Sequence, residues 1–156
     1  MNWVVGNGID EYLNDLKALE NSHATGKAIY EGAKIVADAV RGGIQSLPVQ
    51  EHSKGTMVRG VTSAQKKGLV EGFGISRLEE DGSYRNVKLG FDGYNETKTQ
   101  KYPKGQPNAM VARFVESGNS YHQKTPFIGP AVNKTKSQAE QKMAQVVDKE
   151  IQQIFK

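Results

Sequence analysis

The sequence predicts a helix-rich α+β fold in which residues 1–156 form a single domain. Two observations carry this prediction. Apolar residues recur at helical spacing towards both ends of the chain, and between them lies a stretch of alternating apolar and polar residues that is typical of a strand. We therefore expect an N-terminal helix pair and a long C-terminal helix to pack on a small antiparallel β-hairpin or sheet. A chain of this length buries roughly 70% of its unfolded surface, enough for its own core.

Two helices are predicted near the N-terminus. The first runs from about Ile9 to Glu20. Its apolar residues fall on one face: Ile9, Tyr12, Leu13, Leu16 and Leu19. The second runs from about Ala24 to Ser46, and small residues along it let another helix approach closely. Pro48 lies just beyond its end. We interpret these two segments as a hairpin of helices that bury one shared face.

A loop and a short helix are predicted next. Residues 49–61 are polar and contain glycine, a composition typical of an exposed connection. Thr62 or Ser63 then offers a side-chain oxygen to cap a helix that runs through about Gly72. The apolar positions of this segment are Leu69, Val70 and Phe73.

A β-hairpin is predicted after the short helix. Ile75–Glu79 and Tyr84–Gly93 form its two arms, because Asp81-Gly82 between them is a strong turn signal. Apolar and polar residues alternate in the second arm, so one face is expected to be buried. Two strands alone are only marginally stable in water. Either helices cover the hairpin, or a neighbouring subunit adds strands to its free edges.

The connection from Gly93 to Pro107 is unusually long. Loops of more than roughly 12–15 residues without secondary structure are uncommon unless they are functional or disordered. Tyr94 and Tyr102 lie among lysines, which suits an interface that becomes ordered on assembly. A floppy surface loop is the alternative interpretation.

The segment from Asn108 to Ala131 connects this loop to the last helix. Asn108 is placed to cap a short apolar helix, and Gly118 is placed to end that helix in a left-handed conformation. A polar loop follows and leads to Pro126-Phe127. Pro130 has the fixed φ that suits the first position of a helix. The whole segment is typical of a device that holds two helices at a set angle.

A long helix is predicted to run from Pro130 to about Phe155. At 1.5 Å per residue it would be about 39 Å long, the longest element of the fold. Its apolar stripe is interrupted at Glu150 and otherwise sustained: Val132, Thr135, Ala139, Met143, Val146, Val147, Ile151 and Ile154.

Two side chains of the connecting segment have alternative interpretations. Glu116 either bridges to a basic residue of a neighbouring subunit, with Arg113 or Lys124 as candidates, or is a solvated carboxylate near a helix end. Phe127 is interpreted as a core anchor in preference to an exposed contact.

The connecting segment resembles the tail-completion, or head–tail joining (neck), family of long-tailed bacteriophages. That family typically has an apolar-Val-Glu-x-Gly segment, a short loop, a Pro-Phe-x-x-Pro-Ala segment and a terminal helix. The matching residues here are Val115, Glu116, Gly118, Pro126, Phe127, Pro130 and Ala131. As subunit or partner contacts we expect Glu116, Gly118, Pro126, Phe127, Pro130 and Arg113, together with Tyr94 and Tyr102.

The resemblance implies a structural virion protein, assembled in the bacterial cytoplasm, that forms a closed ring, with a hexamer as the expected stoichiometry. Its partners would be copies of itself, a tail terminator or tail-tube protein, and a head-side connector or stopper protein. Genomic DNA would pass through the ring with non-specific contacts. A tail terminator or a head-side connector shares this size and ring geometry and is the alternative function.

Charge and composition leave a further alternative of another class, a small basic DNA-binding protein. The net charge is +4 and 37% of the residues are hydrophobic, with a mean hydropathy of −0.61. The basic residues are scattered, so solvated faces are favoured over a DNA-binding patch. No stretch approaches the roughly 20 apolar residues of a membrane span, and none resembles a signal peptide.

The residue pattern indicates no catalytic, cofactor or metal site, and we expect no enzyme. The chain has no cysteine, which excludes disulfides and thiolate ligands. His23, His52 and His122 lie far apart in polar stretches, so surface positions are expected for all three. No serine has the Gly-x-Ser-x-Gly setting of a hydrolase, and no phosphate-binding loop occurs.

Overall fold

The computed structural model describes residues 6–21, 23–51, 57–82 and 84–155. Its elements in chain order are α1 (Gly6–Asn21), α2 (Ala24–Gln45), β1 (Val58–Arg59), α3 (Ser63–Gly72), β2 (Phe73–Ile75), β3 (Glu79–Asp81), β4 (Tyr84–Asn86), β5 (Leu89–Phe91), α4 (Asn108–Ser117), β6 (His122–Gln123) and α5 (Ile128–Ile154). Within these ranges the strands form three two-stranded sheets. The predicted helix-rich α+β fold is confirmed.

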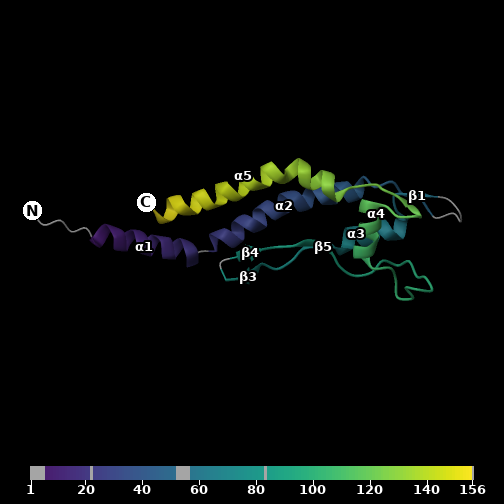
Figure 1. Ribbon diagram of the computed structural model, residues 1–156, viewed down its shortest axis with the longest axis horizontal. Helices are drawn as coiled ribbons and strands as arrows, with labels where there is room; N and C mark the ends of the chain where they lie inside the picture. Colours follow the sequence, from purple (N-terminus) through teal and green to yellow (C-terminus); the bar gives the residue numbers. More distant parts are fainter. Residues whose placement is uncertain (1–5, 22, 52–56, 83, 156) are drawn as a thin grey trace, which may run out of the picture.

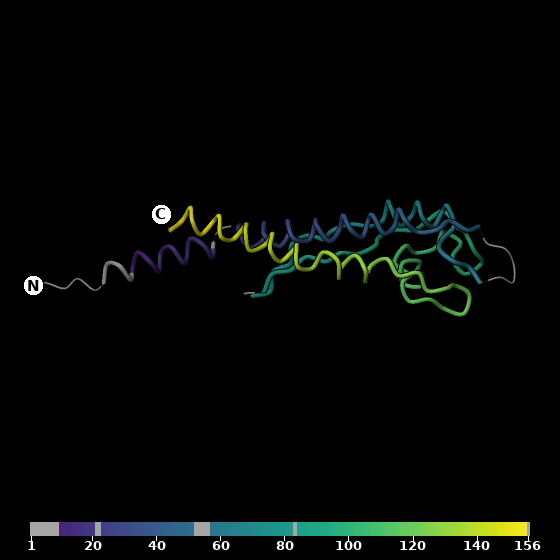
Figure 2. The backbone as a smooth tube through the Cα atoms, turned by 90° about the horizontal axis from the view of Figure 1, so that it is seen from above, coloured from purple at the N-terminus to yellow at the C-terminus, as the bar shows by residue number. Residues whose placement is uncertain are grey.

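The molecule is elongated (Figure 1). α2 and α5 run side by side along much of its length, and α3 and α4 are gathered where α2 ends. α1 extends away from the opposite end, near the end of α5. The view turned by 90° shows the same pairing of the two long helices (Figure 2).

α2 packs along its length against α5, so the predicted hairpin of the two N-terminal helices is wrong. α1 contacts the body at the last turns of α5, where the ring centroids of Tyr12 and Phe155 lie 5.9 Å apart. Leu13 and Leu16 remain 48% and 38% exposed. Periodicity shows which face of a helix is apolar, but not which helix covers it. α5, with 27 residues, covers more of the 22-residue α2 than the 16-residue α1 would.

Small residues bring the two long helices together. A Cβ built on Gly32 would lie only 2.7 Å from the Cγ of Met143, so this glycine permits the close approach predicted for the second helix. On α5 the buried positions are Ala131, Thr135 and Ala139, one turn apart. Val132, predicted in the same stripe, lies at its margin and is 37% exposed.

The predicted hairpin is confirmed as one antiparallel ribbon in two sections. β2 pairs with β5, and β3 pairs with β4 at the tip, where Gly82 has the positive φ expected of a turn glycine. The first arm begins at Phe73, two residues earlier than predicted. α2 packs against this ribbon, and the Tyr30 hydroxyl donates to the Ser76 carbonyl at 3.1 Å. Helices therefore cover one face of the hairpin, which is the first of the two alternatives expected for it.

The prediction of an exposed loop for residues 49–61 is wrong at its end. β1 pairs in parallel with β6, which lies some sixty positions further along the chain. Val58 and Val61 are buried, and the Val61 amide donates to the Pro48 carbonyl at 3.0 Å. A two-residue strand with so distant a partner has no periodic signal of its own. Residues 52–56 lie outside the described residues.

The core is centred on the end of α2, with α3, α4, the hairpin and the start of α5 around it. Three aromatic rings pack in a row where the hairpin meets the core: the centroids of Phe73 and Phe91 are 5.1 Å apart, and those of the partly buried Phe91 and of Phe127 are 6.1 Å apart. Phe127 is only 4% exposed. The preferred interpretation of Phe127 as a core anchor is confirmed.

Candidate functional site: the junction of α4 and α5

The side chain of Glu116, at the end of α4, binds the beginning of α5. Its Oε2 accepts hydrogen bonds from the backbone amides of Phe127 at 2.7 Å and Ile128 at 2.8 Å, and its Oε1 accepts one from the amide of Gly129 at 2.8 Å. The first amides of a helix have no partner within it and point along the positive end of the helix dipole. A carboxylate from another helix therefore caps α5 and fastens the two helices together.

Pro130 completes this cap, although not in the position predicted for it. α5 begins at Ile128, so Pro130 is its third residue and the prediction that it opens the helix is wrong. The physical reason is that Glu116 supplies acceptors for the preceding amides, which allows helical geometry to start earlier. Proline has no amide hydrogen, so the fourth donor is absent. None of the initial amides of α5 is left without a partner.

The environment of Glu116 favours its charged form. Partial burial acts to raise the pKa of this carboxyl, but the amide donors of Ile128, Gly129 and Phe127 and the charge of Lys124 together outweigh it and lower the pKa below its ordinary value. Arg113 is exposed on α4 and, among the described residues, forms no ion pair with Glu116. The carboxylate is thus bound within its own chain, a role that neither sequence interpretation included.

Gly118 ends α4 with a positive φ, but its conformation is not the left-handed helical one that was predicted. Its φ is +74° and its ψ is 167°, a combination that is almost restricted to glycine, and its amide donates to the Phe114 carbonyl at 2.8 Å. A Cβ at this position would lie 3.1 Å from the Cβ and the amide nitrogen of Lys124. The turn sends the chain back along α4, where the Thr125 amide donates to the Val115 carbonyl at 2.8 Å.

We predict that Gly118→Ala lowers the free energy of unfolding by about 1–3 kcal/mol, because alanine is strained at this φ and ψ. Urea denaturation followed by circular dichroism measures the change. Gly42→Ala is the matched control: a Cβ there meets nothing within 4 Å, and alanine in the helix interior is expected to stabilise α2 by about 0.5–1 kcal/mol. Equal effects of the two substitutions would contradict the prediction.

Asn108 is a buried anchor, and the prediction that it caps α4 is wrong. The cap position is Pro107, and Asn108 is the first helical residue, with only 2% of its surface exposed. Its Nδ2 donates to the Asp92 carbonyl at 2.8 Å, so it joins the end of the hairpin to the start of α4. Residue type indicated a cap, but burial depends on the neighbouring Gly68 and Gly72 of α3, where a Cβ would collide with the Asn108 side chain.

The loop of residues 93–107 is held at its base by polar groups that sequence reasoning missed. Asn95 is buried, its backbone amide donates to the Gln106 carbonyl at 2.9 Å, and its Oδ1 accepts from the Thr97 amide at 2.8 Å. Buried Gln65 donates to the Gln106 side chain at 2.9 Å. Gln65 also completes a capping box with Thr62, and this Thr-x-x-Gln pattern is a signal that the sequence contained.

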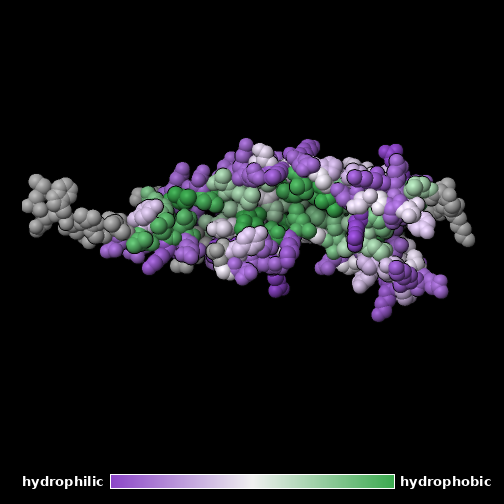
Figure 3. Space-filling view, in the orientation of Figure 1, coloured by the Kyte–Doolittle hydropathy of each residue, from purple (hydrophilic) through white to green (hydrophobic). Residues whose placement is uncertain are grey.

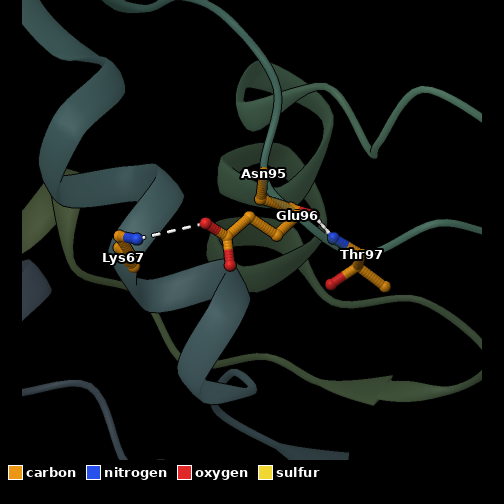
Figure 4. A network of polar contacts seen from close by, with 4 residues as sticks. All are labelled: Lys67, Asn95, Glu96 and Thr97. Carbon is orange, nitrogen blue, oxygen red and sulfur yellow. Dashed lines mark hydrogen bonds and ion pairs between the residues drawn. The ribbon is translucent and has the colours of Figure 1, made fainter.

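One further contact ties this loop to α3. The Nζ of Lys67 and the Oε1 of Glu96 lie 3.1 Å apart, beside the Asn95–Thr97 turn (Figure 4). Tyr94 is 67% exposed, and Tyr102 is half-buried with the Nζ of Lys101 5.5 Å from its ring centroid. The described loop is therefore anchored at its base, where Tyr94 pairs with Pro107, and presents Tyr102 and basic groups further out.

The structure gathers five of the eight predicted contact residues at the junction: Glu116, Gly118, Pro126, Phe127 and Pro130. Arg113 lies about one turn before Glu116 on α4 and is exposed to solvent. Tyr94 and Tyr102 belong to the loop that projects beyond α4 (Figure 1). Around the junction, a groove between the end of α2 and the start of α5 is lined by Gly43, Leu47, Pro126, Pro130 and Lys134. Pro126 and Pro130 are exposed on its wall.

The described residues contain no group of three or more histidine, aspartate or glutamate side chains that could hold a metal ion. None of the helices in the described ranges is long and apolar enough to cross a membrane. His23 is exposed, whereas the ring of His122 is half-buried and its centroid lies 4.2 Å from that of Phe114. His52 lies outside the described residues.

Comparison of the chain with models of protein families, with curated proteins and with solved structures gave no match.

Proposed function

We propose that this chain is a structural virion protein of a tailed phage or prophage, which joins or completes the tail at its head-proximal end. It would act as one subunit of a homo-oligomeric ring, expected to be a hexamer, around the DNA channel. One observation carries the proposal: the two short segments that resemble the neck family meet through a single side chain. Glu116 from the first segment holds the amides of Phe127, Ile128 and Gly129 in and beside the second.

The junction suits a protein that works by shape and burial. A ring subunit must present its contact surfaces at one fixed angle, because small errors accumulate around the ring. The Glu116 cap, the Gly118 turn and the buried Phe127 ring fix the direction in which α5 leaves α4. Next to them, the groove at Pro126 and Pro130 offers a neighbour an apolar surface with Lys134 at its side.

A tail terminator or a head-side connector would need the same ring, and the junction supports these functions equally. A small basic DNA-binding protein remains the alternative of another class, and the loop of residues 93–107 favours it. Lys98, Lys101 and Lys104 are exposed there, and in the described part of the chain none of them is in an ion pair. Such a loop can bind the phosphates of DNA without contacting the bases.

Native mass spectrometry of the purified chain tests the proposal, first alone and then mixed with the tail-tube protein of the same phage or prophage. The expected result is one discrete closed oligomer, either from the chain alone or only with the tail-tube protein. A chain that stays monomeric in both samples would contradict the proposal. Duplex DNA titrated at low and high salt separates the alternative, since binding by the monomer that weakens steeply with salt would favour the DNA-binding function.

A further inference from the structure

α1 is an acidic helix with an uncovered apolar stripe. It carries four carboxylates, Asp10, Glu11, Asp15 and Glu20, against one lysine, Lys17, in a chain whose net charge is +4. Tyr12, Leu13 and Leu16 are 56%, 48% and 38% exposed. A hydrophobic area is visible where α1 extends from the body (Figure 3).

A helix with an exposed apolar face gains little stability from its own chain. An isolated helix of about 15 residues is only marginally stable, and most helical stability in proteins comes from packing an apolar face. α1 has 16 residues and touches the rest of its own chain mainly at the last turns of α5. The exposed surface of Tyr12, Leu13 and Leu16 therefore remains available to another molecule.

A groove of complementary character lies between the beginning of α2 and the last turns of α5. Lys27, Lys142 and Lys149 line it together with Val146 and Gln145. Within the described ranges none of these three lysines forms an ion pair with a carboxylate. Two carboxylates, Glu31 and Glu150, also line the groove, and Glu31 is already paired with Lys34 at 3.2 Å. The free charges of the groove are thus mainly positive.

We propose that α1 of one copy of this chain docks in the α2–α5 groove of a second copy. The apolar stripe would cover Val146 and the aliphatic stems of the lysines, and the carboxylates of α1 would face the lysine ammonium groups, so charge complementarity selects the partner. Pairing one α1 stripe with another is opposed, because each helix carries a net charge of −3. Donor helix and acceptor groove are different surfaces, so the contact is head-to-tail and can close into a ring.

Directed disulfide formation tests this contact, because the chain has no cysteine of its own. Leu13→Cys and Gln145→Cys are purified separately, mixed and oxidised. We expect a covalent dimer containing one of each, since a disulfide needs Cβ atoms about 3.5–4.5 Å apart. Val70→Cys, at a 43% exposed position on α3, replaces Gln145→Cys in the matched control and should give several-fold less dimer. Dimers from Leu13→Cys alone, in excess of the mixture, would overturn the proposal in favour of stripe-to-stripe pairing.

Charge reversal provides a second test that does not depend on oxidation. Asp10→Lys with Asp15→Lys, or Lys142→Glu with Lys149→Glu, should each raise the dissociation constant of the oligomer about tenfold or more. Mixing the two double variants should restore contacts at the matched interface and recover larger species. Failure of the mixture to assemble, with both variants folded by circular dichroism, would contradict the docking.

The docking rests on the homo-oligomer of the proposed function, and the outcomes separate the two. An oligomeric wild-type chain that gives no Leu13–Gln145 disulfide and ignores the charge reversals overturns the docking and leaves the ring intact. A wild-type chain that is monomeric alone and with the tail-tube protein overturns both.

Discussion

Phe127→Ala is expected to lower the free energy of unfolding by about 3–5 kcal/mol, because it removes a buried aromatic ring and leaves a cavity. The ring is 4% exposed, stacks edge-on against Phe91 and sits directly before α5. The surrounding backbone cannot close the cavity easily, since the Phe127 amide is held by Glu116 and a Cβ on Gly43 of α2 would lie 2.9 Å from the Phe127 carbonyl oxygen.

Urea denaturation measures this loss, and Phe127→Leu is its control. Leucine keeps most of the apolar volume, so this variant should lose less than about 2 kcal/mol. A loss below about 1 kcal/mol for Phe127→Ala would mean that the ring does not support the core. Under the proposed function, Phe127→Ala should also impair head–tail joining, through misplacement of α5. Normal infectious particles from this variant would remove the importance claimed for the junction.

Glu116→Ala is expected to lower the free energy of unfolding by about 2–3 kcal/mol, because three amide donors lose a charged acceptor at once. Glu116→Gln should cost less, since its single carbonyl oxygen still accepts a hydrogen bond but carries no charge. Glu116→Lys should be the most damaging of the three, as it places a positive charge at the positive end of α5 and also should impair assembly. Thermal and urea denaturation measure the series, and equal stability of all three variants and the wild type would contradict the cap.

Acidification gives the same cap a second, independent signature. The folded-state pKa of Glu116 is lowered, chiefly because its amide donors outweigh the opposing effect of partial burial, so its stabilising contribution is complete above the unfolded-state pKa of about 4.3. It is lost as the pH falls from that value through the folded-state pKa. The stability difference between wild type and Glu116→Gln should therefore shrink as the pH falls below about 4.3. Glu140→Gln, at an exposed position on α5, is the control.

The local features of the fold were predictable because local chemistry decides them. α2 spans Ala24–Gln45 against a predicted end at Ser46, and Thr62 caps α3 as its side-chain type predicts. Gly82 turns the hairpin, and Gly118 ends α4 with a positive φ. In each case one or two residues restrict their own backbone, so the cause and the effect lie within a few positions of the chain.

The partners of these elements were not predictable in the same way. Apolar spacing marked α1 and α5 alike as amphipathic, and the choice of α5 as the partner of α2 depends on matching lengths and on the fit of Met143 over Gly32. The parallel pairing of β1 with β6 joins two-residue strands far apart in sequence. Which elements pair depends on how the whole chain packs, and no single segment encodes that.

The types of the longer elements, the Thr62 cap of α3 and the turns at Gly82 and Gly118 follow from the sequence alone, since side-chain capping, glycine φ angles and apolar periodicity act locally. The role of Glu116, in contrast, depends on how distant parts of the chain pack together. Eleven positions separate it from Phe127 in the chain, and its charge, its neighbours and its position near a helix end indicated a surface carboxylate or an intersubunit pair. The Gly118 turn brings that carboxylate to the unpaired amides of α5, where hydrogen bonding and the helix dipole act together over less than 3 Å.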